Sequence, residues 1–333
     1  MKVGVIGAGA VGGTFAALLE HAGHDVEVTA RGEQLAAIRE RGLDFSGGFG
    51  AWTSHVRAGE LLTERPDLAI LTTKAQDARA ALEPHAGLLA GVPLLVVQNG
   101  LGGLDVAHSL LPDSPILGGL ALFAASYLEP GKVFITAGLP TIIGAGPGCT
   151  SEHLHHVVTA IGSAVPLEVT DDMEGAQWTK LLINHVNGLP AITGLSVQEV
   201  IGDQRLRRIM TASMRETARI ALASGAHFAT VQRTPGRLMS IVAWAPLWIG
   251  QAFPLRVNAG LGTVPNPGST LQSIRRGRKT EIDFLNGATV RVAASIGRSA
   301  PINAAIVALV HEVEASGTFI PPDEVVRRFA GLR

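Results

Sequence analysis

Cysteine is almost absent from this 333-residue chain, and charged and aromatic side chains are scarce. Cys149 is the single cysteine, which excludes a disulfide framework or a cysteine metal site within the chain and is typical of a reducing cytosol. Charged residues make up 17% of the chain and the formal net charge is −1, so nothing indicates electrostatic binding of nucleic acid. A hydrophobic fraction of 47% excludes a disordered protein.

Signals for a leader or a membrane anchor are also missing. The strand-like Lys2–Ile6 opens the chain and glycines follow at once, so we expect no signal peptide and a cytoplasmic protein. The longest uncharged stretch lies between Arg237 and Arg256, is interrupted by prolines, and is slightly short of the roughly 20 apolar residues of a membrane span. We interpret it as a buried helix, a lid or a subunit interface.

The first half of the chain alternates apolar runs with amphipathic segments, which predicts βαβ units and a parallel sheet. Strands are expected at Val3–Ile6, Val26–Ala30, Leu68–Thr72, Leu94–Gln98 and Ile116–Ala124. Helices are expected at Val11–His21, Gln34–Arg41, Gln76–Leu89, Leu104–Leu110 and Glu152–Val165. Val133–Thr136 and Thr141–Gly144 are interpreted as a hairpin or a pair of edge strands.

The second half has helical periodicity, with apolar residues recurring at spacings of three and four. Helices are expected at Trp178–Val186, Leu206–Ala223, Leu271–Ile296 and Ala304–Val313. The predicted fold class is therefore α/β, with a Rossmann-type parallel-sheet domain over residues 1–170 and a mostly α-helical domain over residues 171–333.

A glycine-rich turn follows the first predicted strand, with the sequence Gly7-Ala8-Gly9-Ala10-Val11-Gly12. GxGxxG alone is a weak signal in a chain with 40 glycines, but here it lies between a strand and a helix, with a second strand at the expected distance. In such a turn Gly7 permits the tight bend, Gly9 lets the backbone approach a pyrophosphate, and Gly12 lets the helix pack close to the strand. These residues predict a dinucleotide site.

Basic residues at strand ends favour NADP(H) as the dinucleotide. The second strand ends at Arg31 with no acidic residue at its tip, and a guanidinium there can bind a 2′-phosphate in a bidentate manner. Lys74, after the strand at Leu68–Thr72, lies at the same predicted edge. Each could equally be a solvated basic residue. Asn99, in the Gln-Asn-Gly after the next strand, is a candidate nicotinamide or substrate contact or only part of a turn.

In the helical half, Lys180 and Asn184 are four residues apart and share a helix face. A lysine buried beside a cofactor has a lowered pKa and can donate a proton near neutral pH, although most helical lysines only extend to solvent.

Five features together resemble the ketopantoate reductase (2-dehydropantoate 2-reductase) family: the Gly7–Gly12 turn, Lys74, the Gln-Asn-Gly turn, the W-x-K-L-x-x-N helix, and the block Ser269–Gly287 that contains Thr-Glu-Ile-Asp-Phe. The resemblance covers nearly the whole chain. It implies reduction of a 2-oxo acid by NADP(H), with ketopantoate to pantoate as the leading reaction, in pantothenate biosynthesis.

The resemblance also implies roles for individual residues. Lys180 and Glu281 would be the catalytic residues. Lys180 would protonate the carbonyl oxygen, and Glu281 would lie where cofactor and substrate meet, positioning Lys180 or contacting the nicotinamide ribose. The substrate-binding set would be Asn99, Lys180, Asn184, Asn187 and Ser269. The cofactor-binding set would be Gly7, Ala8, Gly9, Ala10, Val11, Gly12, Arg31, Lys74, Asn99, Ala125 and Glu281.

Two departures from the family pattern bear on the substrate. The pattern places a second asparagine four residues after Asn184, where this chain has Gly188, with Asn187 one position earlier. The stretch Leu238–Leu255 looks like an insertion, which would reshape the pocket if it covers the cleft, or would form a homodimer interface if it lies outside. We favour the interface.

Other readings remain open from the sequence. A paralogous reductase of another 2-oxo acid or an imine would use the same Lys180 chemistry, and a non-catalytic NADP(H) sensor would need only the fold. We expect no metal, because His153, His155 and His156 have no carboxylate or cysteine at metal-ligand spacing.

Overall fold

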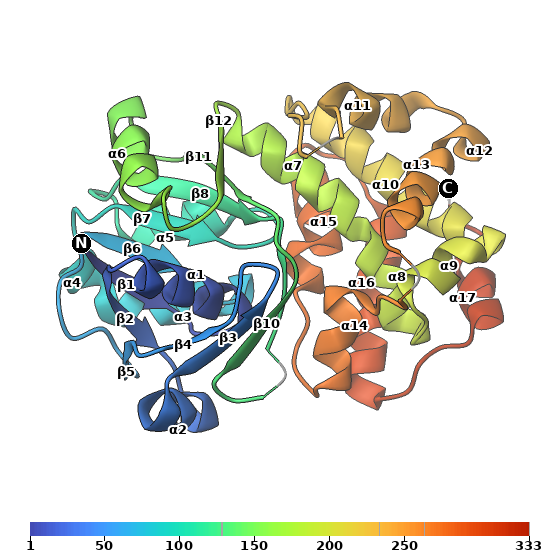
Figure 1. The fold of residues 1–333 in the computed structure, drawn as a ribbon. Coiled ribbons are helices and arrows are strands. Elements are labelled where there is room, and N and C mark those ends of the chain that lie inside the picture. Colours follow the sequence, from blue (N-terminus) through green and yellow to red (C-terminus); the bar gives the residue numbers. More distant parts are fainter. Residues whose placement is uncertain (128, 233, 263, 333) are drawn as a thin grey trace. The chain divides into compact units, whose positions relative to one another are not determined.

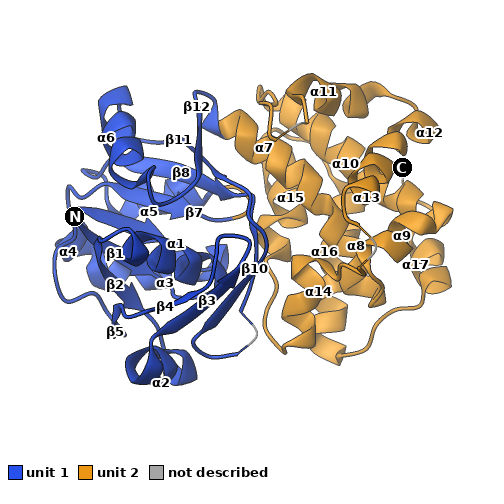
Figure 2. Cartoon of the chain, viewed as in Figure 1, with its two compact units in different colours: residues 1–98, 102–173 blue, residues 99–101, 174–333 orange. Residues whose placement is uncertain are grey.

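A computed structural model describes residues 1–127, 129–232, 234–262 and 264–332. The chain divides into two compact units (Figure 2). Unit 1 consists of residues 1–98 and 102–173, and unit 2 consists of residues 99–101 and 174–333. The short segment 99–101 therefore groups with the C-terminal half, although Gln98, the residue before it, belongs to unit 1.

Unit 1 is built on an eight-stranded sheet with the order β12-β11-β8-β7-β6-β1-β2-β5 (Figure 1). All neighbouring pairs are parallel except β11 and β8, so the predicted parallel sheet is confirmed. The strands are β1 (Lys2–Ile6), β2 (Asp25–Thr29), β5 (Arg57–Gly59), β6 (Leu68–Leu71), β7 (Leu94–Val97), β8 (Ile116–Ala121), β11 (Thr141–Ala145) and β12 (Leu167–Thr170).

A second sheet of four strands has the order β4-β3-β10-β9. Its strands are β3 (Leu43–Gly47), β4 (Trp52–Ser54), β9 (Ala124–Ser126) and β10 (Lys132–Ala137). The expected pairing of Val133–Thr136 with Thr141–Gly144 is therefore wrong, because β10 pairs with β3 and β9 while β11 pairs with β8 and β12. Both are interior strands, of two different sheets, so neither forms a hairpin with the other or an edge.

Helix α1 (Ala10–His21) packs against strands of both sheets, and its apolar residues join one core with theirs. Phe15 is fully buried there beside Phe123, with ring centroids 6.3 Å apart. The opposite face of the large sheet is covered by α3 (Ala78–Leu82) and α5 (Gly103–Leu110). The remaining helical segments of unit 1 are α2 (Gly32–Arg41), η1 (Ala75–Asp77), η2 (Glu83–His85), α4 (Ala86–Leu89) and α6 (Ser151–Ile161).

Unit 2 is mostly helical, as predicted, and has one large apolar core. The single helix expected over Leu271–Ile296 is wrong, because α14 stops at Arg275 and α15 begins only at Asn286. The segments are α7 (Met173–Asn184), η3 (His185–Asn187), α8 (Gly188–Thr193), α9 (Val197–Gly202), α10 (Gln204–Ala223), α11 (Gly236–Trp244), α12 (Leu247–Gly250), α13 (Ala252–Ala259), α14 (Gly268–Arg275), η4 (Ile282–Phe284), α15 (Asn286–Ser295), α16 (Pro301–Ser316) and α17 (Pro322–Phe329).

The uncharged stretch between Arg237 and Arg256 forms α11, α12 and the first part of α13. It is not a buried helix, since Ile241, Trp244 and Trp248 expose 56%, 71% and 75% of their surface. Within the part of the chain that the structure describes, no helix has the length and apolar character needed to cross a membrane.

Candidate active site

The turn between β1 and α1 has the geometry that its glycines predict. Gly7 adopts a φ of +103°, a region that other residues rarely enter. A Cβ on Gly12 would lie 2.0 Å from the Gly7 carbonyl oxygen and 2.4 Å from Thr72 Oγ1, so only glycine lets α1 pack this close. A Cβ on Gly9 would meet nothing within 4 Å, which leaves open space beside the backbone.

Side chains hold this turn in place. The Gly7 N–H donates to Thr29 Oγ1 at 2.9 Å, and Thr72 Oγ1 donates to the Gly7 carbonyl at 2.7 Å. Gln34, which is buried, donates from Nε2 to the Ala8 carbonyl at 2.7 Å and accepts the Gly131 N–H at 2.6 Å. Among the residues that the structure describes, no side chain caps the N-terminus of α1, so its first N–H groups are available for an anion. The turn therefore fits a pyrophosphate.

Three further predicted cofactor residues belong to unit 1. Arg31 is exposed at the end of β2 and is the N-cap residue of α2. Lys74 precedes η1, directly after Thr73, whose methyl group would lie 2.7 Å from a Cβ on Gly7. Ala125 lies on β9 in the small sheet and is half-buried. Arg31 and Lys74 thus follow the two strands, β2 and β6, that flank β1.

Sequence reasoning missed a group of polar atoms at this same edge. Thr73 Oγ1, Gln76 Oε1 and Gln98 Oε1 are buried, and none has a hydrogen-bond partner among the described residues. Gln98 also donates from Nε2 to the Thr73 carbonyl at 2.7 Å, so two of the three residues are joined. Buried polar atoms are nearly always paired in proteins, so unpaired ones beside a dinucleotide turn fit a bound ligand. The only sequence signal was the position of Gln98 directly before Asn99.

Lys180 and Asn184 lie one helical turn apart on α7. The Lys180 side chain is half-buried, and burial lowers the pKa of its ammonium from 10.5 to about 8. Desolvation disfavours the charged form of an amine, which explains the direction of the shift. Lys180 can therefore hold a proton at neutral pH and release it readily, as a general acid must.

Amide groups connect four of the predicted substrate residues. Asn184 Nδ2 donates to Asn99 Oδ1 at 3.4 Å, and the Asn184 carbonyl accepts from Asn187 Nδ2 at 3.0 Å. Asn187 Oδ1 in turn accepts the Ser269 N–H at 3.3 Å at the start of α14. Asn99, Asn184, Asn187 and Ser269 are thus brought together within unit 2.

Gly188 has a structural reason to lack a side chain. Residues 185–187 form the short η3 segment, and α8 begins at Gly188. A Cβ there would lie 2.9 Å from Ile306 Cγ2, so an asparagine at this position would require Ile306 to move. Asn187 instead provides the amide, and both of its polar atoms are engaged by the backbone of Asn184 and Ser269.

Glu281 is half-buried at the start of η4, in a segment held at both sides by α16. Glu314 Oε1 accepts the Thr280 N–H at 2.7 Å. His311 lies 3.0 Å from Asp283 Oδ1 and 2.8 Å from Glu314 Oε2. Burial alone would lower the pKa of His311, but its hydrogen bonds to Glu314 and Asp283 outweigh burial and raise that pKa above 6.5.

We predict that His311→Gln lowers the melting temperature at pH 5.5 and hardly changes it at pH 8.5. Because the pKa of His311 is higher in the folded than in the unfolded protein, its stabilisation is complete below pH 6.5 and is lost as the pH rises through the folded value. The groups are largely exposed, so the effect is about 0.5–1 kcal/mol, or about 1–3 °C. Thermal unfolding followed by circular dichroism measures it, and an equal shift at both pH values would contradict this assignment.

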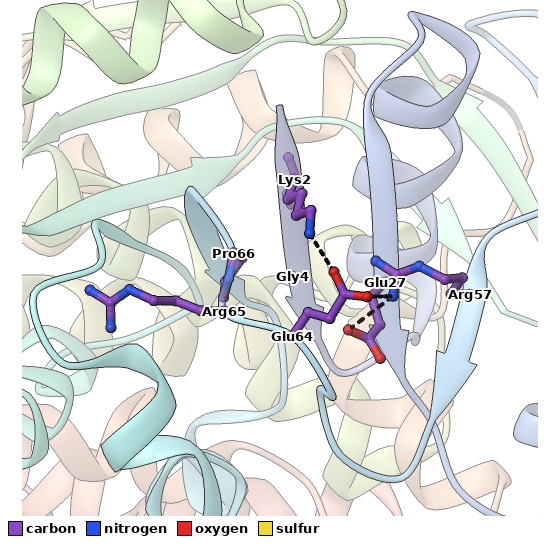
Figure 3. A pocket seen from close by; sticks show the side chains of 8 residues that line it. Lys2, Gly4, Glu27, Arg57, Glu64, Arg65 and Pro66 are labelled. Atoms are coloured by element: carbon purple, nitrogen blue, oxygen red, sulfur yellow. Dashed lines mark hydrogen bonds and ion pairs between the residues drawn. The ribbon is translucent and has the colours of Figure 1, made fainter.

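A small pocket lies at the amino-terminal edge of the large sheet, opposite to the edge that carries the glycine turn (Figure 3). It is not a second ligand site. Glu64 lies there between Lys2 and Arg57, with ion pairs of 2.5 Å and 3.2 Å. Glu27 is buried beside them and accepts two hydrogen bonds from Thr63. The side chains of Lys2, Glu64 and Arg57 are thus already paired with one another.

The fold and the glycine turn define a class of protein, the two-unit dinucleotide-binding proteins with a helical C-terminal half. Comparison with known proteins identifies the family. Residues 3–148 match the family described as ketopantoate reductase PanE/ApbA, and residues 172–314 match its C-terminal part. The chain belongs to the ketopantoate reductase family and is an oxidoreductase, which confirms the resemblance seen in the sequence.

Relatives match over nearly the full length of the chain. The 2-dehydropantoate 2-reductase of Pyrococcus horikoshii is 30% identical over 95% of this chain and 99% of its own length. A crystal structure of a PanE/ApbA family ketopantoate reductase from Ralstonia eutropha has a TM-score of 0.82 at 28% identity, covering 95% of this chain and 99% of that chain. D-mandelate dehydrogenase in complex with NADH shares the fold, with a TM-score of 0.80 at 22% identity, over 95% of this chain and 99% of that one.

Proposed function

We propose that the protein reduces a 2-oxo acid with NADPH, and that ketopantoate to pantoate is the leading reaction. The observation that supports this most is the half-buried Lys180, whose pKa of about 8 is suited to proton donation, one turn from Asn184 and its partner Asn99. A non-catalytic NADP(H) sensor would need no proton donor at this position. The names of the relatives, which are 2-dehydropantoate 2-reductases, favour this substrate among 2-oxo acids.

Lys180 is the proton donor in this proposal. When bound, NADPH supplies a hydride to the carbonyl carbon of the substrate. The electron pair of the carbon–oxygen π bond moves to the oxygen, and Lys180 Nζ gives that oxygen its proton, leaving a neutral amine. While protonated, the ammonium also stabilises the negative charge that develops on the oxygen. The products are a 2-hydroxy acid and NADP⁺.

Amide and hydroxyl groups beside Lys180 orient the substrate. We assign Asn99, Asn184 and Ser269 to its carboxylate and hydroxyl groups, since their side chains offer donors of the kind that such groups need. Asn187 is engaged with Asn184 and Ser269, so it acts by holding these two residues. Glu281 is assigned to the position where cofactor and substrate meet, within a segment that α16 holds.

The cofactor would be held by Gly7–Gly12 at its pyrophosphate and by Arg31 at the 2′-phosphate of NADP(H). Lys74 and Ala125 are assigned to the same cofactor. Thr73, Gln76 and Gln98 extend the assignment, because their buried oxygens lack partners among the residues that the structure describes.

The experiment that tests this function is NADPH oxidation by the purified protein, followed at 340 nm with ketopantoate and a panel of other 2-oxo acids. Efficient turnover of ketopantoate is the expected result. An aromatic 2-oxo acid is the second candidate, because a ternary structure of D-mandelate dehydrogenase, which has the same fold, contains NADH and anilino(oxo)acetate. Tight NADPH binding without reduction of any 2-oxo acid would overturn the proposal.

We also propose a homodimer in which a second copy covers the exposed apolar face of α11 and α12. A face with two tryptophans exposed by more than 70% is unusual for a monomer and typical of an interface. We predict that Trp244→Glu with Trp248→Glu converts a dimer of about 69 kDa, twice the 34.6 kDa chain, into a monomer. Sedimentation velocity measures this. A wild-type protein that is still monomeric at 10 times the protein concentration used in the NADPH oxidation assay would contradict the proposed dimer.

A further inference from the structure

A buried polar cluster lies directly behind the lysine helix. His185 follows Asn184, and its side chain turns into the interior of unit 2, where it is 1% exposed. Both ring nitrogens have partners: Nδ1 lies 2.9 Å from Asn286 Nδ2, and Nε2 lies 3.1 Å from Thr217 Oγ1. Ser213 Oγ is a further neighbour of Nδ1 at 2.9 Å. The ring thereby connects the end of α7 to α10 and α15.

The partners of His185 are themselves tied together. Asn286 Nδ2 and Ser213 Oγ both donate to Asn303 Oδ1, at 2.9 Å and 2.8 Å, which adds α16 to the cluster. Asn303 Nδ2 donates to Glu216 Oε2 at 2.7 Å. Asn286, Ser213 and Asn303 are fully buried. Four helical segments are therefore linked by side chains in a place where water cannot replace a lost partner.

The hydrogen-bond partners of the imidazole are amide and hydroxyl groups, which suit a neutral ring. Nδ1 meets Asn286 Nδ2 and Ser213 Oγ, and Nε2 meets Thr217 Oγ1, so in the neutral ring one nitrogen carries the proton and the other accepts a hydrogen bond. Burial lowers the pKa of His185 to about 3, so the ring is neutral over the working range of the enzyme. A neutral ring with both nitrogens engaged cannot rotate without leaving a buried group unpaired, at a cost of about 1–3 kcal/mol.

The cluster joins the two segments that contain the proposed catalytic residues. His185 is the residue after Asn184 on the lysine helix, and Asn286 begins α15 five residues after Glu281. Their direct contact at 2.9 Å connects the backbone that bears Lys180 to the backbone that bears Glu281.

We propose that His185 and Asn286 are positioning residues, which fix the lysine helix relative to the Glu281 segment without touching substrate or cofactor. This inference rests on the proposed function of Lys180. A misplacement of about 1 Å at a reacting group can lower a rate by about 100-fold, so loss of this contact should appear in kcat.

The test compares kcat and KM for three substitutions. His185→Leu should lower kcat by about 10- to 100-fold and leave KM for NADPH within about 3-fold, because the dinucleotide turn belongs to unit 1. His185→Gln, which retains a donor and an acceptor, should recover kcat to within about 5-fold of wild type. Thr211→Val is the matched control, since it removes a buried hydroxyl on α10 whose one hydrogen bond among the described residues goes to the Arg207 carbonyl of the same helix, and it should leave kcat unchanged.

A double-mutant cycle checks that the two residues act through one contact. Asn286→Ala should lower kcat to a similar extent as His185→Leu, and the combination should be little worse than either, because the same link is broken. Additive losses, a full kcat in folded His185→Leu, or an equal loss in Thr211→Val would each overturn the proposal.

A readout without substrate separates this inference from the proposed function. The chain has five lysines, so the pKa of Lys180 can be followed by NMR in lysine-labelled protein and assigned with Lys180→Met. We expect His185→Leu to move that pKa from about 8 toward 10.5, as the helix loses its fixed place. Failure of the wild type to reduce any 2-oxo acid would reject the function only, whereas an unmoved Lys180 pKa would reject the positioning role.

Discussion

Lys180→Met is expected to slow reduction by about 10³-fold while it makes the folded protein more stable. The substitution keeps a long, unbranched side chain but removes the proposed proton donor. General acid catalysis contributes about 10²- to 10⁴-fold, so kcat should fall by about 10³-fold with little change in NADPH affinity. In the wild type, kcat/KM for reduction should fall about tenfold per pH unit above pH 8, because only the protonated amine can donate.

The gain in stability follows from the same lowered pKa. Below pH 8 Lys180 is charged in both the folded and the unfolded protein, and the folded protein bears the full cost of its desolvation. As the pH rises from about 8 toward 10.5 the amine loses its charge first in the folded protein, and the cost disappears. Because the side chain is only half-buried, we expect about 1–2 kcal/mol at pH 7, or about 2–6 °C in melting temperature.

Thermal unfolding at pH 7 and pH 10, together with rates at 340 nm, measures both effects. Lys132→Met is the matched control, because Lys132 is an exposed lysine whose partner is Glu129 at 2.8 Å. It should change neither kcat nor its pH dependence. A Lys180→Met protein that retains more than about a tenth of the wild-type kcat would show that another group donates the proton, while a lower melting temperature would show that Lys180 is not strained by burial.

Local features of the site could be predicted because adjacent residues determine them. A glycine turn between a strand and a helix is specified by about 30 consecutive residues. Gly7 has the positive φ angle that such a turn requires, Gly9 has open space beside it, and Gly12 is closely packed. The i, i+4 placement of Lys180 and Asn184 on one helix is equally local.

Features that depend on distant partners could not be predicted in the same way. β10 pairs with β3, which is almost 90 residues earlier, and nothing in the short strand Leu43–Gly47 indicates that partner. The break between α14 and α15 is another case, since the helical periodicity continues through Gly277 while Glu314 and His311 hold the intervening segment from α16. His185 was visible beside Asn184, but its role depends on polar groups from three other helices.

Arg31→Ala is expected to remove the preference for NADPH over NADH. Arg31 is the exposed residue at the end of β2, and the strand ends with no acidic side chain at its tip that would bind the ribose hydroxyls of NAD. Its backbone is well placed for this role, because Gln34, one turn further along α2, is bonded to the Ala8 carbonyl of the glycine turn. A guanidinium–phosphate pair of this kind contributes about 2–3 kcal/mol, so KM for NADPH should rise by about 30- to 160-fold.

Steady-state kinetics with both dinucleotides separates the roles of Arg31. KM for NADH should stay within about 3-fold of wild type, because NADH lacks the phosphate that the guanidinium would bind. Arg39→Ala is the control on the same helix, since Arg39 is exposed and donates to the Ala58 carbonyl at 2.9 Å, and it should alter neither value. If Arg31→Ala weakens the binding of NADPH and of NADH equally, Arg31 supports the glycine turn and does not bind the 2′-phosphate. If it weakens neither, the basis for choosing NADPH over NADH is lost, and the cofactor is then decided by whichever dinucleotide the wild type uses at lower concentration.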